Sequence, residues 1–137
     1  MRLEITRRSD LALRALQALE TADGPVRAVD LAARLSSTPQ YIPQVMTPLV
    51  RAGWVASEPG PRGGYRLAGV LGARSVLQLI ELMEGETDSG KCVLRGGPCL
   101  GEEHCALHEA WSIARSALVG RLSEVPVSAL ATRGVEK

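Results

Sequence analysis

The order of the periodic segments is the feature that most limits how this chain can fold. Three segments repeat apolar residues every three or four positions, the spacing that predicts amphipathic helices. They cover residues 9–21, 29–35 and 39–52. Two short strand-like segments follow, residues 54–57 and 65–68, and the proline- and glycine-rich turn between them predicts a β-hairpin. This order predicts a mainly α fold with a small β-hairpin, the winged helix-turn-helix.

Prolines disturb the third helical pattern. Thr38 is expected to cap this helix, with Pro39 at its first position. Pro43 and Pro48 fall further inside the pattern. Each of them removes a backbone donor and clashes with the preceding turn, which costs about 3 kcal/mol in a regular helix interior. We therefore expect the helix to start late, to kink, or both.

The chain divides into a head, a loop, a long helix and a tail. Residues 1–85 are expected to form the winged head, because a fourth helical pattern ends at Gly85. The periodicity disappears in residues 86–104, a glycine- and acid-rich loop that something other than packing must hold. A helical pattern resumes over residues 105–125, and residues 126–137 are expected to form a short helix and a tail.

The pattern over residues 105–125 favours a dimer. Its apolar positions advance by four, three, four and four residues, which aligns them along one seam of a helix of about five turns. They are Leu107, Trp111, Ala114, Leu118 and Leu122. The alternative is a core helix lying on its own domain, but the head already has enough elements to close its own core. We therefore expect a winged head with a long dimerisation helix, and a homodimer.

Composition argues against several classes of protein. The 137 residues correspond to one domain of ordinary size. Three cysteines cannot all pair within one chain and no secretory leader is visible, so we expect a cytoplasmic protein. No apolar run approaches the roughly 20 residues that cross a bilayer, so no membrane role is expected. No Ser-His-Asp set, phosphate loop or paired carboxylates indicate an enzyme.

The formal charge of +1 conceals two regions of opposite sign. Between Glu81 and Glu109, seven acidic side chains stand against Lys91 and Arg95, a formal charge of −5. The remainder of the chain therefore carries +6. We expect the positive remainder to face DNA and the acidic segment to face away from it.

The start of the third helix and the hairpin turn carry residues suited to double-stranded DNA. In a winged helix-turn-helix, these elements enter the major groove and touch the flanking backbone or minor groove. Glutamine can grip an adenine edge, hydroxyl groups can bind phosphates, and an arginine between glycines can reach a groove. The candidates are Thr38, Gln40, Tyr41, Gln44, Arg62 and Gly63. The alternative is a winged domain that binds only other proteins.

A second group of residues is suited to a metal. Cys92, Cys99 and Cys105 stand at fixed separations, and a histidine, His108, follows one helical turn later. Three sulfurs and one imidazole suit either a structural zinc or an iron–sulfur cluster. The gaps of six and five residues between the cysteines exceed those of usual zinc pairs and leave room for a larger inorganic core. The alternative is three free thiols, with His104 and His108 as ordinary surface residues.

Four stretches are specific enough to compare with known families. They are Met1–Leu3, the helical stretch Pro39–Val55 with its ending Arg51–Val55, Gly60–Tyr65 and Cys92–Trp111. Together they resemble the Rrf-type winged-helix regulators, and especially the iron–sulfur cluster assembly regulators among them. The resemblance runs from Met1 to Leu130 and implies a 2Fe-2S cluster, favoured over 4Fe-4S. The ligands that it implies are Cys92, Cys99, Cys105 and His108.

Some positions depart from the family pattern. The gap between Cys92 and Cys99 is one residue longer, so the loop must adjust locally. Pro43 replaces an acidic residue that helps the cluster assembly regulators to choose their DNA sites. Pro59 replaces a wing arginine, and Arg62 is a possible substitute three positions later.

Asp10 is the alternative fourth ligand. Its position is similar to the one from which nitric-oxide-sensing relatives supply a carboxylate from the partner subunit. In structural terms Asp10 is also an acid in the first turn of a helix, which the helix dipole favours. We place His108 ahead of Asp10.

The expected function is that of a homodimeric transcriptional regulator. Its two heads are expected on operator half-sites about one helical turn, roughly 34 Å, apart. Occupancy of the cluster, which redox state, iron or nitric oxide would change, is expected to be coupled to DNA affinity. The alternative from another class is a zinc-stabilised winged-helix protein-interaction module without a redox sensor.

Overall fold

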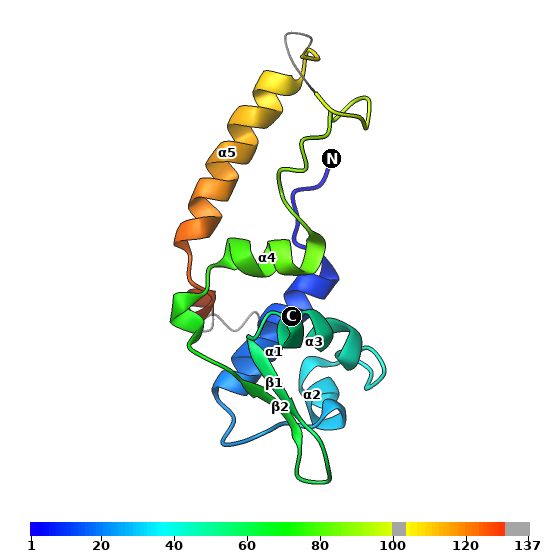
Figure 1. The fold of residues 1–137 in the computed structure, drawn as a ribbon, viewed down its shortest axis with the longest axis vertical. Coiled ribbons are helices and arrows are strands. Elements are labelled where there is room, and N and C mark those ends of the chain that lie inside the picture. Colours follow the sequence, from blue (N-terminus) through cyan, green and yellow to red (C-terminus); the bar gives the residue numbers. More distant parts are fainter. Residues whose placement is uncertain (100–103, 131–137) are drawn as a thin grey trace.

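The computed structural model describes residues 1–99 and 104–130, and its elements follow the expected order (Figure 1). The α-helices are α1 (Arg7–Glu20), α2 (Ala28–Leu35), α3 (Ile42–Arg51), α4 (Val76–Glu84) and α5 (His108–Glu124). The antiparallel strands are β1 (Val55–Glu58) and β2 (Gly64–Leu67), and the 3-10 helices are η1 (Leu71–Ala73) and η2 (Val127–Leu130). In this part of the chain, no helix combines the length and apolar character of a membrane span. The mainly α fold with a small β-hairpin is confirmed.

Helix α1 is the centre of an aliphatic core in the head. It contacts α2, α3, α4 and β2, and its inward face is completely buried. The fully buried side chains include Leu16, Leu31, Ile42, Met46, Leu49 and Leu79. Burying one such side chain contributes about 1.5–3 kcal/mol. This packing holds the apolar face of α3 against α1, so the opposite face of α3 points to solvent.

Helix α1 begins at Arg7, before the start of its apolar pattern. The Thr6 side chain caps it and accepts a hydrogen bond from the backbone N–H of Ser9 at 3.2 Å. Ser9 itself is buried within the helix, and its hydroxyl donates to the carboxylate of Glu84 at the end of α4. The first turn of α1 is therefore joined to the last residue of α4, close to the start of the cysteine loop.

Helix α3 starts late, as the prolines require. The N–H of Tyr41 donates to the carbonyl of Thr38 at 3.1 Å, which forms a separate turn before the helix begins at Ile42. The expectation that Thr38 caps the helix is therefore wrong, because this turn lies between them. Pro43 falls in the first turn of α3, where no helical partner is lost, whereas Pro48 lies inside the helix.

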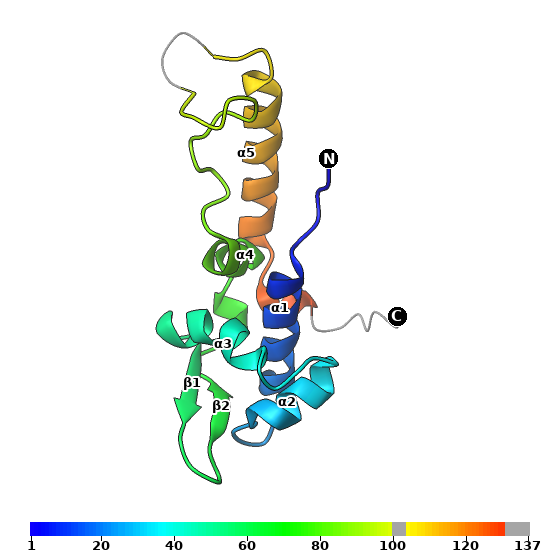
Figure 2. The same cartoon turned by 90° about the vertical axis from the view of Figure 1, so that its right-hand side faces the viewer.

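Helix α5 stands away from the head and carries the cysteine loop at its far end (Figures 1 and 2). Its base is fixed by backbone bonds of 2.8 Å, from Val76 N–H to the Val125 carbonyl and from Val127 N–H to the Arg74 carbonyl. The hairpin lies at the opposite end of the long axis. The cysteine loop and the hairpin thus lie at opposite ends of the molecule.

The predicted seam of the long helix is divided between two environments. Leu107, Trp111 and Leu122 are half-buried against their own chain. Ala114 and Leu118 are exposed. The helix begins at His108 rather than at residue 105, and η2 occupies the place of the expected short C-terminal helix. Residues 131–137, where the tail is expected, and residues 100–103 of the expected loop lie outside the described residues.

Candidate metal centre and nucleic-acid interface

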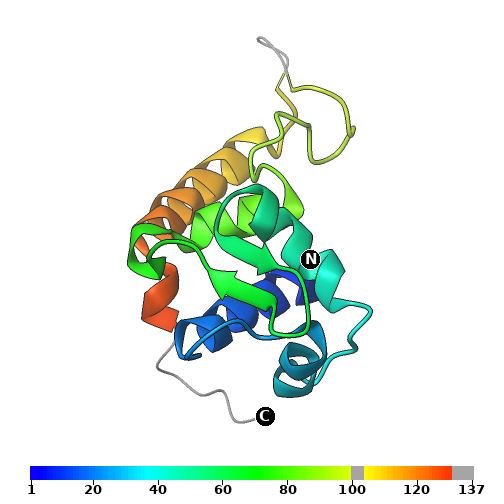
Figure 3. The ribbon, with the colours of Figure 1, turned by 60° about the horizontal axis from the view of Figure 1, so that its bottom comes forward.

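The elements that carry the predicted DNA-contacting residues lie at one end of the head. Helix α2, the connection to α3 and the hairpin lie together at the end opposite α5 (Figure 3). Ser36 adopts the left-handed conformation, with φ 53°, and turns the chain from α2 towards α3. Thr38, Gln40 and Gln44 are exposed and Tyr41 is half-buried. These four line a shallow cavity of about 590 Å³, so the structure brings them together.

Two arginines that sequence reasoning missed lie beside this surface. Arg8 of α1 and Arg51 of α3 line an open cavity of about 440 Å³ together with Tyr41 and Gln44. Cations at this position suit the phosphate backbone of DNA. The consecutive arginines at positions 7 and 8 were a visible signal, but only the packing of α1 against α3 places Arg8 here.

The two residues predicted in the hairpin turn, Arg62 and Gly63, differ in their exposure. Arg62 is exposed at the tip, apart from the other four candidates, whereas Gly63 is buried. The N–H of Gly63 donates to the carbonyl of Gly60 at 3.0 Å. A Cβ at position 63 would collide with the backbone carbonyl of Glu58 in the same hairpin. The hairpin itself therefore requires Gly63, whether or not DNA approaches its backbone.

Replacing Gly63 by alanine is expected to destabilise the protein by about 1–3 kcal/mol, the usual cost of forcing an atom into occupied space. The free energy of unfolding from denaturant titration measures the effect. Gly24→Ala is the control, because a Cβ there has nothing within 4 Å. Equal stability of the two variants would show that the turn opens easily around position 63.

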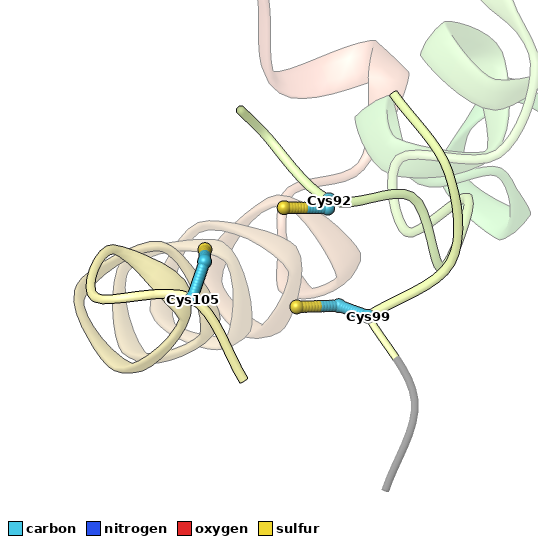
Figure 4. Close-up of side chains that lie close together, drawn as sticks. All are labelled: Cys92, Cys99 and Cys105. Atoms are coloured by element: carbon cyan, nitrogen blue, oxygen red, sulfur yellow. The ribbon is translucent and has the colours of Figure 1, made fainter. Parts of the chain in front are cut away.

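Three cysteine side chains converge beside the first turn of α5 (Figure 4). The sulfur atoms of Cys92, Cys99 and Cys105 all lie within 4.8 Å of one another. Backbone bonds hold the first two in place, from Cys92 N–H to the Gly97 carbonyl at 2.6 Å and from Cys99 N–H to the Gly90 carbonyl at 3.4 Å. Cys105 lies in the turn just before α5. All three are free cysteines, so the three predicted sulfur ligands form one cluster.

The loop favours a thiolate at Cys92. Backbone N–H groups of Leu94 and Arg95 donate to its sulfur and, against the effect of burial, lower the pKa of Cys92 from 9.0 to about 7. The N–H of Leu107 likewise favours the Cys105 thiolate, but burial and the neighbouring Cys92 outweigh it and raise the pKa of Cys105. The Cys92 thiolate thus disfavours the ionisation of Cys105, and a cation between the sulfurs would relieve this repulsion.

The two candidates for a fourth ligand lie in different places. His108 lines the same cavity of about 180 Å³ as the three cysteines, and its ring stacks on that of His104 with centroids 3.6 Å apart. Asp10 lies on α1 in a separate cavity of the head, where its carboxylate is 3.7 Å from Arg14. Among the described residues, the group within 4.8 Å contains sulfurs and no histidine nitrogen. Within one chain, His108 is therefore beside the cysteines and Asp10 is not.

Polar contacts that sequence reasoning missed fasten the start of the loop. The carboxylate of Asp88 lies 3.6 Å from the guanidinium of Arg115 on α5, which also lines the cysteine cavity. Asp88 accepts a hydrogen bond from Gly90 N–H at 3.1 Å as well. The residue before Asp88 is also held, because the carboxylate of Glu81 on α4 accepts a hydrogen bond from Thr87 N–H at 2.7 Å. The acid-rich composition of the loop was the only sequence signal for these contacts.

The donor set fits a soft metal centre. In a tetrahedral zinc site with Zn–S bonds of about 2.3 Å, the sulfurs stand about 3.8 Å apart. Three sulfurs within 4.8 Å need little rearrangement to reach that geometry. Iron–sulfur clusters use the same thiolate ligands around a larger core. The three cysteines therefore fit either centre, and metal content distinguishes the two.

A winged helix-turn-helix head joined to a cluster of three thiols defines the class of DNA-binding transcriptional regulators with metal-binding cysteines. Residues 5–133 match the model of the Rrf2 family, which is described as an iron-dependent transcriptional regulator. The chain belongs to the Rrf2 family. The resemblance to Rrf-type regulators is thus confirmed.

The relatives found by sequence are regulators and not enzymes. The chain is 32% identical over 113 residues to the HTH-type transcriptional regulator IscR of Cronobacter sakazakii, covering 82% of this chain and 69% of the relative. The IscR of Klebsiella pneumoniae is 31% identical over the same lengths. The chain is accordingly a transcriptional regulator, in agreement with the absence of catalytic motifs from its sequence.

Solved structures agree on the fold. CymR (YrzC), the global cysteine regulator of B. subtilis, superimposes with a TM-score of 0.76 at 26% identity, covering 96% of this chain and 98% of CymR. IscR of T. potens gives a TM-score of 0.72 at 22% identity, covering 93% of this chain and 85% of IscR. The latter likeness concerns the fold alone.

Proposed function

We propose that the chain is a cytoplasmic, homodimeric transcriptional regulator that senses redox state, iron or nitric oxide through an iron–sulfur cluster. The convergence of three sulfurs within 4.8 Å carries this proposal. This cluster is remote from the proposed reading surface, which is formed by Thr38, Gln40, Tyr41 and Gln44. Cys92, Cys99 and Cys105 supply three ligands and His108 the fourth, with Asp10 of the partner subunit as the alternative. A 2Fe-2S cluster is favoured over 4Fe-4S, because imidazole replaces thiolate on iron in known 2Fe-2S centres.

The exposed side of α5 supports a dimer. Leu118 is 45% exposed and Ala114 of the same seam is also exposed, on a helix with no buried side chain. Apolar side chains that project from a helix standing away from its own head are suited to a second copy of the same helix. Two heads joined in this way would fit operator half-sites about 34 Å apart.

Contacts within the chain offer a route for coupling the loop to the head. When bound, a cluster supplies a centre whose charge or occupancy changes with redox and iron status. The loop starts two residues after Glu84, which is hydrogen-bonded to Ser9 on α1, and it is held to α5 by the pair of Asp88 and Arg115. Loop ordering that shifts these contacts would change DNA affinity, with a typical coupling of about 1–3 kcal/mol.

The alternative function is a zinc-stabilised module that binds another protein. Anaerobic purification followed by iron, sulfide and zinc counts, with visible spectra and duplex titrations, separates the two. Our proposal requires iron and acid-labile sulfide, visible absorption and salt-dependent binding to duplex DNA. Colourless, iron-free protein with one zinc per chain and no duplex binding would establish the module instead.

Two substitutions are expected to affect DNA reading in different ways. Gln44→Ala should relax the choice of base at one operator position and cost about 1–3 kcal/mol of specific binding, because a bidentate base contact is lost. Arg62→Ala should weaken binding and lower the slope of log affinity against log salt by about 0.9, because one cation leaves the interface. Anisotropy titrations with a selected operator and its single-base variants, at several salt concentrations, measure both effects.

Arg66→Ala is the matched control on the hairpin. Arg66 pairs with Glu58 at 2.8 Å, so its charge is already compensated, and we expect a smaller change in the salt slope than for Arg62. Unchanged affinity and unchanged base preference in both Gln44→Ala and Arg62→Ala would refute the assignment of the reading surface.

A further inference from the structure

A proline inside α3 leaves one backbone carbonyl without its helical donor. In a regular α-helix, the carbonyl of Gln44 accepts from the N–H four residues later. That residue is Pro48, which has no N–H. The affected carbonyl belongs to the residue whose side chain is predicted to read a base. Helix α3 therefore lacks one of its internal backbone hydrogen bonds, at the residue that is predicted to contact a base.

Arg8 donates to this carbonyl from another helix. Its guanidinium Nη2 lies 3.3 Å from the backbone oxygen of Gln44. A donor that carries a charge forms a stronger hydrogen bond than a neutral one, and the guanidinium remains charged at every relevant pH. Arg8 is itself well placed to hold α3, because the next residue, Ser9, is buried and bonded to Glu84.

A direct contact between Arg8 and a DNA phosphate is the competing explanation. Arg8 and Arg51 line the same open cavity of about 440 Å³, and a cation there could meet the DNA backbone. Arg51 makes no described hydrogen bond to the carbonyl of Gln44, whereas Arg8 reaches the one carbonyl of this segment whose partner is a proline. Because the Arg8 guanidinium donates to the same carbonyl that Pro48 leaves without a donor, we favour a contact of Arg8 with α3 over a contact with DNA.

We propose that Arg8 is a positioning residue for DNA reading, which replaces the hydrogen bond that Pro48 removes and thereby holds Gln44 in place relative to α1. This inference rests on the proposed function as a DNA-binding regulator. It has a specific consequence. The protein needs Arg8 only as long as residue 48 lacks an N–H, so the effects of substitutions at positions 8 and 48 cannot be additive.

A double-mutant cycle with Arg8→Ala and Pro48→Ala tests the inference. In the otherwise natural chain, Arg8→Ala should lower the ratio of operator affinity to non-specific duplex affinity about fivefold, the net scale of one hydrogen bond lost at an exposed position. In the Pro48→Ala background, the restored N–H supports Gln44, and the same change should alter this ratio by less than about twofold. Arg8→Lys should retain part of the ratio, because an ammonium also donates. The salt slope should stay the same in all four proteins of the cycle.

Arg51→Ala is the matched control, with an expected effect that is equal in both backgrounds. If Arg8→Ala costs the same in both backgrounds and lowers the salt slope by about 0.9, Arg8 binds phosphate and the inference is wrong. It is also wrong if operator and non-specific binding fall together with the fraction of folded protein, because Arg8 is then merely structural.

Thermal unfolding of the same four proteins separates this inference from the proposed function. The melting temperature depends on the hydrogen bond between Arg8 and Gln44 and is measured without DNA. Arg8→Ala should lower the melting temperature of the natural chain and should leave that of the Pro48→Ala chain unchanged. A chain that binds no duplex would overturn the proposed function, and additive melting temperatures would overturn the role of Arg8 in supporting α3.

Discussion

Replacing Cys99 by alanine is expected to abolish the metal centre. The natural chain, purified without oxygen, should contain iron and sulfide, and the Cys99→Ala chain should contain almost none and lose its visible absorption. The sulfur of Cys99 is one of three within 4.8 Å. Loss of an outer contact to a metal ligand typically costs about 10–100-fold in metal affinity, so loss of a thiolate ligand should cost more than about 100-fold. Iron and sulfide counts per folded chain measure the effect.

Leu94→Ala is the matched control for the cysteine variant. Leu94 is 63% exposed in the same loop, and its truncation should leave iron content and spectrum unchanged. Cys99 lies outside the core of the head, so the helical circular dichroism of both variants should match that of the natural chain. A Cys99→Ala protein with full iron content would contradict the proposed ligand set.

The same measurement separates the two candidates for the fourth ligand. His108 lines the cysteine cavity, whereas Asp10 belongs to the head and could reach a cluster only from the partner subunit. His108→Ala is therefore expected to alter the spectrum, and Asp10→Ala to leave it unchanged. The reverse result would assign the fourth position to Asp10 of the partner subunit.

Replacing Leu118 by glutamate is expected to dissociate the dimer. Leu118 is 45% exposed in the single chain, so the change should not unfold the protomer. In a symmetric interface the change occurs twice, and each copy loses a buried leucine, worth about 1.5–3 kcal/mol, and gains an unpaired charge. The dissociation constant of the dimer should therefore rise about 1000-fold or more. Sedimentation velocity over a range of concentrations measures it, and affinity for a two-half-site operator should fall in parallel.

Ser116→Glu is the control for a charge on α5. Ser116 is exposed and lies on the side of the helix away from Leu118. This variant should remain dimeric and keep its operator affinity. A Leu118→Glu protein that stays dimeric at micromolar concentration would show that the subunits meet through another surface.

The helices of the head were predictable because each depends on local periodicity. The apolar spacing identifies α1, α2, α3 and α4, and the prolines predict the late start of α3. Their boundaries were less predictable. Helix α1 begins at Arg7 with Thr6 as its cap, two residues before the predicted start, and Thr38 forms a turn ahead of α3 instead of capping it. Caps depend on which side chain finds an orphan N–H in three dimensions, and several nearby hydroxyls have the required chemistry.

The cysteines of the candidate metal site could be predicted from the sequence, but the polar contacts that hold their loop could not. Cysteines separated by glycine-rich segments identify a thiol cluster, and the sulfurs do converge. The contact between Asp88 and Arg115 was not visible, since it joins residues from a loop without periodicity and a helix on which many charged positions look alike. The periodicity of α5 likewise identifies an apolar face without saying what covers it.

The sequence by itself determined the order of elements, the residues able to bind metal or DNA, and the division into a positive head and an acidic loop. These properties depend on local spacing and on side-chain chemistry. Only the tertiary structure decided that His108 rather than Asp10 lies beside the cysteines of its own chain, that Gly63 serves the hairpin, and that Arg8 meets the carbonyl that Pro48 leaves unpaired. Such contacts join distant segments, and the path of the whole backbone determines which distant segments meet.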